Sequence, residues 1–130
     1  MKVGWDARLN YYRPGGIAEY TRHVLRALAE LDPQSTYYAI QHFRDRDSLA
    51  CAPNLRQINT LTPSHHRWER RTLPLELVPY RLDIYHTPDA IPVDGGARRC
   101  VITIHDLHFL HYPQFMTPDS RRHYNDQIAW

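Results

Sequence analysis

The stretch KVGWDARLNYYRPGGIAEYTRHVLRAL, residues 2–28, decides the fold class of this chain. Residues 2–6 are short, largely apolar and close to the start, which is typical of a buried first strand. After a loop, apolar side chains recur at three- and four-residue steps from Ile17 to Leu31, and an Asp-Pro pair then stops the pattern. A strand, a glycine-containing loop and an amphipathic helix predict the first unit of an α/β fold.

Four further segments have the composition of β-strands. They are residues 36–43, 55–61, 82–88 and 100–106. The second is weak and is expected at a sheet edge. The fourth, CVITIHD, is the strongest strand pattern in the chain, and its β-branched run predicts burial on both faces. Strands separated by crossovers predict a parallel, Rossmann-like sheet flanked by helices.

The segments between these strands have helical or loop character. Residues 64–81 are expected to be helical, with Pro74 and Pro79 kinking or interrupting the helix. The polar connector at 45–54 offers room for a helical turn. Thr117, followed by a proline, predicts the start of a last helix. That helix has no stop signal before Trp130, so we expect the chain to be a fragment of a longer protein. The alternative is a natural small domain whose last helix ends at the C-terminus.

Composition excludes several classes of protein. A length of 130 residues allows one domain with a sizeable core, and the net charge of +2 gives no argument for nucleic acid. No signal peptide or membrane span is visible. The two cysteines, Cys51 and Cys100, have no metal-like spacing, which favours a cytoplasmic protein with reduced thiols.

Polar residues gather where the expected strands end. In an open parallel sheet, ligands bind beyond the carboxyl ends of the strands. The residues that this rule brings toward one cleft are Asp6, Gly15, Gly16, His86, His105 and Asp106.

Gly15 and Gly16 stand directly before the first helix. Bare amides at a helix N-terminus, together with the helix dipole, form a favourable site for phosphate or another anion. The structural alternative is a turn that requires positive φ, and on local grounds it is the better explanation. Neither GxGxxG nor GxxxxGK[ST] occurs, so NAD-binding and P-loop assignments have little support.

Three histidines, His105, His108 and His111, follow the last strand at three-residue spacing. Histidine is a common zinc ligand, but after a strand the three rings would not share a direction, and no nearby cysteine completes a metal site. We therefore expect no metal. His105 is expected to face the cleft, while the other two belong to a surface loop.

Two aromatic segments allow both a functional and a structural interpretation. HHRWERR, His65–Arg71, is either a solvated charged face or a basic-aromatic patch that contacts anionic lipid head groups. Tyr11 and Tyr12 lie in the loop expected to rim the cleft, where they stack on a sugar or pack as a lid.

Three segments together resemble a known family. GWDARLNYYRPGGIAEYTRHVLRAL, then DIYHTPDAIP and VITIHDLHFLHYP, resemble the N-terminal domain of family 4 glycosyltransferases, which have the GT-B fold. The resemblance covers nearly the whole chain. It implies a retaining enzyme that transfers a sugar from a nucleotide-sugar to an acceptor hydroxyl, without an essential metal or other cofactor. The acceptor would be a carbohydrate or a lipid-linked molecule.

The resemblance also implies roles for individual residues. Gly15 and Gly16 match the glycine loop that approaches the donor diphosphate. His105 matches the histidine beside the transferred sugar, and Asp106 follows it, so these two are the candidate catalytic residues.

Other matches point to the acceptor side of the cleft. Asp6 and Arg8 match the end of the family's first strand, with a role in shaping the cleft. His86 matches the histidine at the end of the fourth strand and would line the acceptor side.

One departure from the family pattern is large. The paired glutamates and the basic residues that hold the donor lie in the family's C-terminal domain, and this chain contains neither. Residues 1–130 therefore resemble an incomplete, acceptor-side half that transfers no sugar alone. The alternative is a non-catalytic α/β module that binds a sugar or a phosphorylated ligand. The resemblance implies a cytoplasmic location, peripheral to the inner face of the membrane if His65–Arg71 contacts lipid.

Overall fold

A computed structural model of the chain describes residues 1–118, apart from the side chains of residues 109 and 113. Its centre is a five-stranded sheet in which every neighbouring pair of strands is parallel and the strand order is β3-β2-β1-β4-β5. The strands are β1 (Lys2–Asp6), β2 (Thr36–His42), β3 (Leu55–Thr60), β4 (Leu82–Thr87) and β5 (Ala97–Ile102). The helices are α1 (Leu9–Tyr12), α2 (Gly16–Leu31), α3 (Glu69–Leu77) and α4 (His108–His111), with 3₁₀ turns η1 (Val78–Tyr80) and η2 (Pro113–Phe115).

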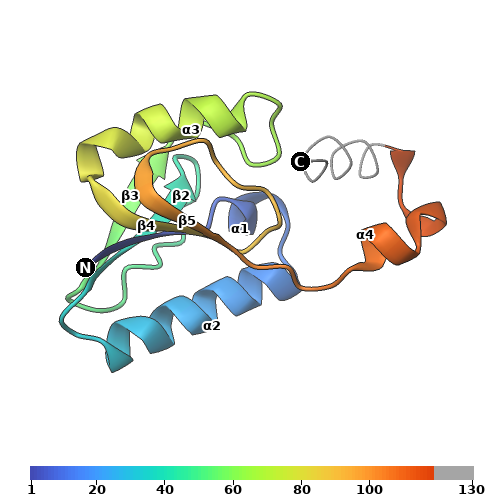
Figure 1. Cartoon of the computed structure of the whole chain (residues 1–130). Coiled ribbons are helices and arrows are strands. Elements are labelled where there is room, and N and C mark those ends of the chain that lie inside the picture. The colour runs from blue at the N-terminus through green and yellow to red at the C-terminus, as the bar shows by residue number, and fades with distance from the viewer. Residues whose placement is uncertain (119–130) are drawn as a thin grey trace.

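The two longest helices cover opposite faces of the sheet (Figure 1). Side chains alternate between the two faces along each strand, so β2, β3 and β4 each contribute to a core on both faces. The core under α2 contains Val3, Trp5, Leu25, Ala29, Tyr37, Ala39 and Leu55. The core under α3 contains Tyr38, Ile40, Ile58, Leu73, Leu77, Leu82, Tyr85 and Val93. The α/β, Rossmann-like arrangement expected from the sequence is confirmed.

Helix α3 continues through Pro74, which the sequence analysis expected to kink or interrupt it. Proline has no N–H for the carbonyl four residues earlier, here that of Arg70. The backbone N–H of Asp94 donates to that carbonyl at 3.2 Å. Gly96 comes close to the same proline with φ +85°, and a Cβ at Gly96 would lie 2.9 Å from the Pro74 Cα. The Asp-Gly-Gly turn therefore packs directly against the proline of the helix.

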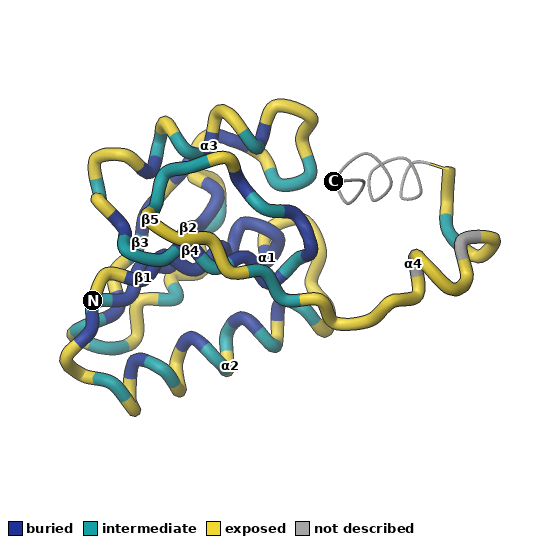
Figure 2. The backbone as a smooth tube through the Cα atoms, viewed as in Figure 1, coloured by how far each residue is buried: buried dark blue, intermediate teal, exposed yellow. Residues whose placement is uncertain are grey.

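The last described strand differs from the expectation. Strand β5 ends at Ile102 rather than at residue 106, and its residues are exposed or only half-buried, so the predicted burial on both faces is wrong (Figure 2). The reason is its position: β5 pairs with β4 on one side, and no described strand lies on its other side. A β-branched composition indicates a strand but does not place it in the sheet.

Other local expectations have mixed outcomes. Strand β3 lies at a sheet edge, and α2 ends at Leu31, as expected. The helix expected from residue 64 begins only at Glu69, and the connector 45–54 contains no helical turn. The helix expected after Thr117 lies almost wholly outside the described residues. No helix in the described part is long and apolar enough to span a bilayer.

Candidate functional site

The N-terminus of α2 is open on its outer side. Gly15 is the N-cap residue, no side chain caps the helix, and both glycines are exposed. The φ of Gly15 is 170°, which is extended backbone that any residue can adopt, and among the described glycines the left-handed φ belongs to Gly96. The explanation that Gly15-Gly16 form a turn with positive φ is therefore wrong. A Cβ built on either residue would meet no atom within 4 Å. The space beside Gly15 and Gly16 is therefore open, and the dipole of the 16-residue helix adds positive potential at this end.

A pocket of about 80 Å³ lies beside this helix end. It is formed by residues from the first turn of α2, from the loop after β4 and from the segment after β5. These are Ile17, Asp89, Ala90, Thr103, Ile104, His105 and Asp106, and we call this cavity the His105 pocket. Gly15-Gly16 and the candidate catalytic pair therefore lie at one end of the sheet, where its strands terminate.

Two contacts hold the His105 ring. Its Nε2 lies 3.0 Å from the carbonyl oxygen of Pro88, and the Tyr20 ring meets it edge-on, with centroids 4.9 Å apart and planes at 89°. Asp106 lines the same pocket, and its Oδ1 accepts a hydrogen bond from the backbone N–H of His108 at 2.9 Å. One oxygen of Asp106 is thus used at the start of α4.

His86 lies behind the His105 pocket rather than on its wall. Its ring packs on the Trp5 ring with centroids 3.9 Å apart, and its Nε2 lies 2.7 Å from the Thr103 hydroxyl. Half-burial lowers the pKa of His86, so the ring favours its neutral form. Thr103, which lines the pocket, stands between His86 and the cavity.

Asp6 and Arg8 form a buried network on the other face of the sheet. Arg8 is fully buried and donates to both carboxylate oxygens of Asp6, from Nε at 2.9 Å and from Nη2 at 2.6 Å. Its Nη2 also donates to Glu69, and its Nη1 donates to the Thr62 carbonyl at 3.0 Å. The Tyr85 hydroxyl donates to Asp6 at 2.6 Å. The network connects the end of β1 to the start of α3.

The network separates the pKa values of its two carboxyl groups. Burial alone would raise the pKa of Asp6, but the charge and hydrogen bonds of Arg8 bring it below its ordinary value. Burial raises the pKa of Glu69, and Arg8 offsets that rise only in part. The pKa of Tyr85 is raised well above its ordinary value by burial and by the charge of Asp6. Arg8 and Asp6 are thus a charged pair, while Glu69 binds a proton more readily.

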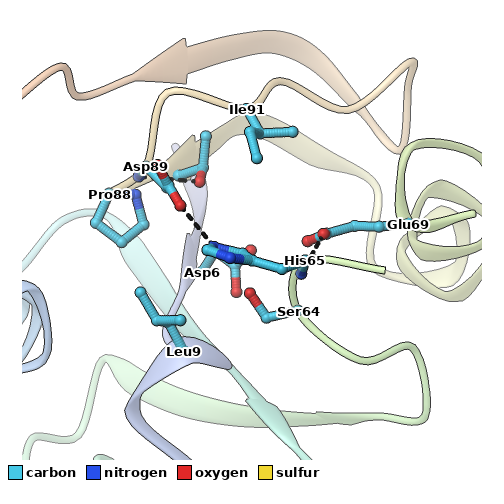
Figure 3. Close-up of a pocket in the computed structure, with 9 residues that line it drawn as sticks. Asp6, Leu9, Ser64, His65, Glu69, Pro88, Asp89 and Ile91 are labelled. Carbon is cyan, nitrogen blue, oxygen red and sulfur yellow. Dashed lines mark hydrogen bonds and ion pairs between the residues drawn. The ribbon is translucent and has the colours of Figure 1, made fainter. Parts of the chain in front are cut away.

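A second, smaller cavity adjoins this network (Figure 3). Its volume of about 10 Å³ is near the size that holds one water molecule. It is lined by Asp6, Leu9, Ser64, His65, Glu69, Thr87, Pro88, Asp89 and Ile91, and we call it the Asp6 pocket. His65 joins two of its carboxylates: its backbone N–H donates to Glu69 at 2.7 Å, and its Nε2 lies 2.6 Å from an Asp89 oxygen.

The expected residues are therefore brought together in two groups rather than one. In the β1–β4 register, Gly4 pairs with Tyr85 and Trp5 with His86, so alternation sends Asp6 and Tyr85 toward α3 but Trp5 and His86 toward α2. Asp89 lines both pockets and lies at their junction.

Tyr11 and Tyr12 lie apart from both pockets. Each is 41% exposed, and both pack against His42 at the end of β2, Tyr11 in a stacked arrangement with ring centroids 4.8 Å apart. Burial, then the charge of Arg44, lowers the pKa of His42. The two tyrosines occupy the same end of the sheet as the His105 pocket but line neither cavity.

The segment HHRWERR does not form one continuous solvated face. His65 contacts Asp89, Glu69 is buried against Arg8, and Arg70 pairs with Asp94 at 2.7 Å. Trp68 is 48% exposed, with the Arg67 guanidinium 5.4 Å from its ring centroid. The segment thus mixes structural contacts with an exposed basic-aromatic part.

Sequence reasoning missed three residues of the Asp6 pocket: His65, Glu69 and Asp89. Asp89 could have been found, because it follows β4 at the carboxyl edge of the sheet. Glu69 gave no local signal, since its partner Arg8 is 61 residues away in the chain.

The described residues include no group of three His, Cys, Asp or Glu side chains that could hold a metal ion. Comparison with known proteins gives no further guide, since no family model, curated protein or solved structure matches the chain.

Proposed function

We propose that this chain is the acceptor-side, Rossmann-like part of a retaining glycosyltransferase, which acts with a donor-binding domain to transfer a sugar from a nucleotide-sugar to an acceptor hydroxyl. One observation carries the proposal. The uncapped N-terminus of α2, left open by Gly15 and Gly16, adjoins a pocket that contains His105. The proposed anion site at the start of α2 and the pocket that would hold the sugar thus have Ile17 in common.

The first part of the argument is electrostatic. The open amides and the dipole of α2 favour a phosphate group near Gly16. Arg13, two residues before Gly15 in the chain and exposed, adds positive charge to the same loop. Glu19 in the first turn brings a negative charge, but its carboxylate is paired with Arg22 at 2.6 Å. A diphosphate is the anion that would use both the open amides and the space above them.

The second part concerns chemistry. Departure of a diphosphate develops negative charge, and oriented backbone N–H groups that face this charge stabilise the transition state. In this proposal the transferred sugar extends from a diphosphate on α2 toward His105, which lines the same pocket as Ile17. The basic side chains that would hold the rest of the diphosphate are not part of this site, so the chain alone is expected to show no sugar transfer.

Calorimetric titration with UDP-, GDP- and ADP-linked hexoses tests the proposal. We expect at least one to bind, and the Gly16→Val variant to lose at least about tenfold in affinity, which corresponds to about 1.4 kcal/mol. Ala27→Val is the matched control, because Ala27 is an exposed residue of the same helix and acquires the same side chain. It should bind as the parent does.

Two results would count against the proposal. Equal affinities of Gly16→Val and the parent protein would remove the anion site from the helix end. Tighter binding of free hexose phosphates than of every nucleotide-sugar would favour the non-catalytic module instead.

A further inference from the structure

The His105 ring is held so that one of its nitrogens is committed within the protein. Its Nε2 lies 3.0 Å from the Pro88 carbonyl oxygen, a group that only accepts hydrogen bonds. A contact at this distance requires a proton on Nε2. A neutral imidazole carries one proton, so its Nδ1 is then an unprotonated acceptor.

Tyr20 fixes the orientation of the same ring. The two rings meet edge-on at 89° with centroids 4.9 Å apart, a favourable geometry for aromatic pairs. Tyr20 is half-buried on α2 and also lies near Trp5, with ring centroids 6.2 Å apart, so its own position is restricted. Rotation of His105 away from Pro88 would break this contact as well as the hydrogen bond.

The other edge of the ring carries Nδ1. Among the residues that the structure describes, none forms a hydrogen bond with Nδ1 of His105, and His105 lines the pocket next to α2. The neighbouring His86 differs, because its Nε2 meets the hydroxyl of Thr103, which both donates and accepts, so its tautomer is not set by that contact. The contact with Pro88 thus sets the tautomer of His105 and leaves its Nδ1 as a hydrogen-bond acceptor that faces no described donor.

We propose that the Pro88 carbonyl and the Tyr20 ring are positioning elements that hold His105 as its Nε2–H tautomer and present Nδ1 to the pocket as a hydrogen-bond acceptor. The group that contacts His105 is then a hydrogen-bond donor, such as a sugar hydroxyl, whereas the anion of the same ligand belongs at the start of α2. This assignment of ligand groups rests on the proposed function. The tautomer itself does not depend on it.

Side-chain NMR of the 130-residue chain tests the proposal without any ligand. Long-range correlations between ring protons and ring nitrogens, recorded at about pH 8 where free histidine is neutral, distinguish the two tautomers. We expect His105 to be protonated at Nε2. Free histidine, measured under the same conditions, serves as the reference for a ring in solvent.

Two variants separate the role of Tyr20 from a general packing effect. Tyr20→Phe keeps the edge-on ring and should leave the Nε2–H tautomer as dominant as in the parent. Tyr20→Leu removes the ring and should give a measurable fraction of the Nδ1–H form. An Nδ1–H tautomer in the parent, or the tautomer mixture of free histidine, would overturn the proposal. An unchanged tautomer in Tyr20→Leu would remove Tyr20 from it.

Failure of this test and failure of the proposed function can be told apart. A fixed Nε2–H tautomer with no nucleotide-sugar binding would leave the positioning of His105 intact and refute the proposed diphosphate site at the start of α2. Binding of a nucleotide-sugar to a chain in which His105 populates both tautomers would refute the positioning of His105 and leave the proposed function standing.

Discussion

Replacement of Arg8 by methionine tests the buried network most severely. Arg8 is fully buried, and its removal leaves the carboxylates of Asp6 and Glu69, which are 6% and 7% exposed, without a counter-charge. Removal of one partner from a buried ion pair costs about 3–5 kcal/mol. Because domains of this size have a stability of about 5–15 kcal/mol, Arg8→Met should remove much of the free energy of unfolding.

The stability lost in Arg8→Met should depend on pH. Without Arg8, both carboxyl groups have raised pKa values in the folded state, so their protonation favours folding as the pH falls. The destabilisation should therefore be smaller at about pH 5 than at about pH 7. Urea unfolding followed by tryptophan fluorescence at the two pH values measures the difference. Trp5, 2% exposed, is the buried reporter.

Two further variants control this experiment. Arg8→Lys keeps the charge but loses the two-pronged contact with Asp6, so it should be destabilised less than Arg8→Met and remain folded if the methionine variant does not. Arg22→Met breaks the exposed pair with Glu19 and should change stability by less than about 1 kcal/mol. A loss below about 1 kcal/mol in Arg8→Met, or one that does not shrink on acidification, would refute the reasoning.

Three more predictions concern the glycines and the buried carboxyl groups. Gly96→Ala should lower the free energy of unfolding by roughly 1–3 kcal/mol, because φ is +85° and the new Cβ would lie 2.9 Å from the Pro74 Cα. Gly95→Ala, whose nearest atom would lie at 3.8 Å, should cost less, and equal losses in urea unfolding would contradict the strain at Gly96. Carbon NMR titration of the carboxyl groups should give a midpoint below the ordinary value for Asp6 and above it for Glu69, and the reverse order would contradict the network. The contribution of Glu69 to stability is then fully present below its unfolded pKa and is lost as the pH rises through the folded value, whereas that of Asp6 is lost as the pH falls through its lowered value. Gly16→Val should keep the fold and unfold within a few degrees of Ala27→Val, since its Cβ meets no atom within 4 Å; a much lower Tm would contradict the open helix end.

The local elements of the fold were readable from the sequence. The periodicity from Ile17 to Leu31 and the Asp-Pro stop predicted α2 correctly, because an amphipathic helix repeats its apolar face along the chain. The position of a strand within the sheet is harder to predict from the sequence. The apolar run after residue 100 predicted a strand buried on both faces, but β5 lies at an edge.

The arrangement of the candidate site could also be predicted only in part. The rule that ligands bind at the carboxyl ends of parallel strands brought Gly16 and His105 correctly to one end of the sheet. It does not say which face a side chain takes, and a one-residue step along β1 separates Asp6 from Trp5 on opposite faces. The partnership of Arg8 with Glu69 could not be predicted, because it depends on how α3 docks onto the sheet.

The central claim is that the start of α2 and the His105 pocket form one ligand site. Backbone amide NMR during titration with the nucleotide-sugar that binds most tightly tests this claim residue by residue. The account predicts that the amides of Gly15, Gly16, Ile17 and His105 shift together and saturate at one ligand concentration. It also predicts little change at Glu69 in the buried network. Saturable shifts confined to another surface, with those four amides unmoved, would contradict it.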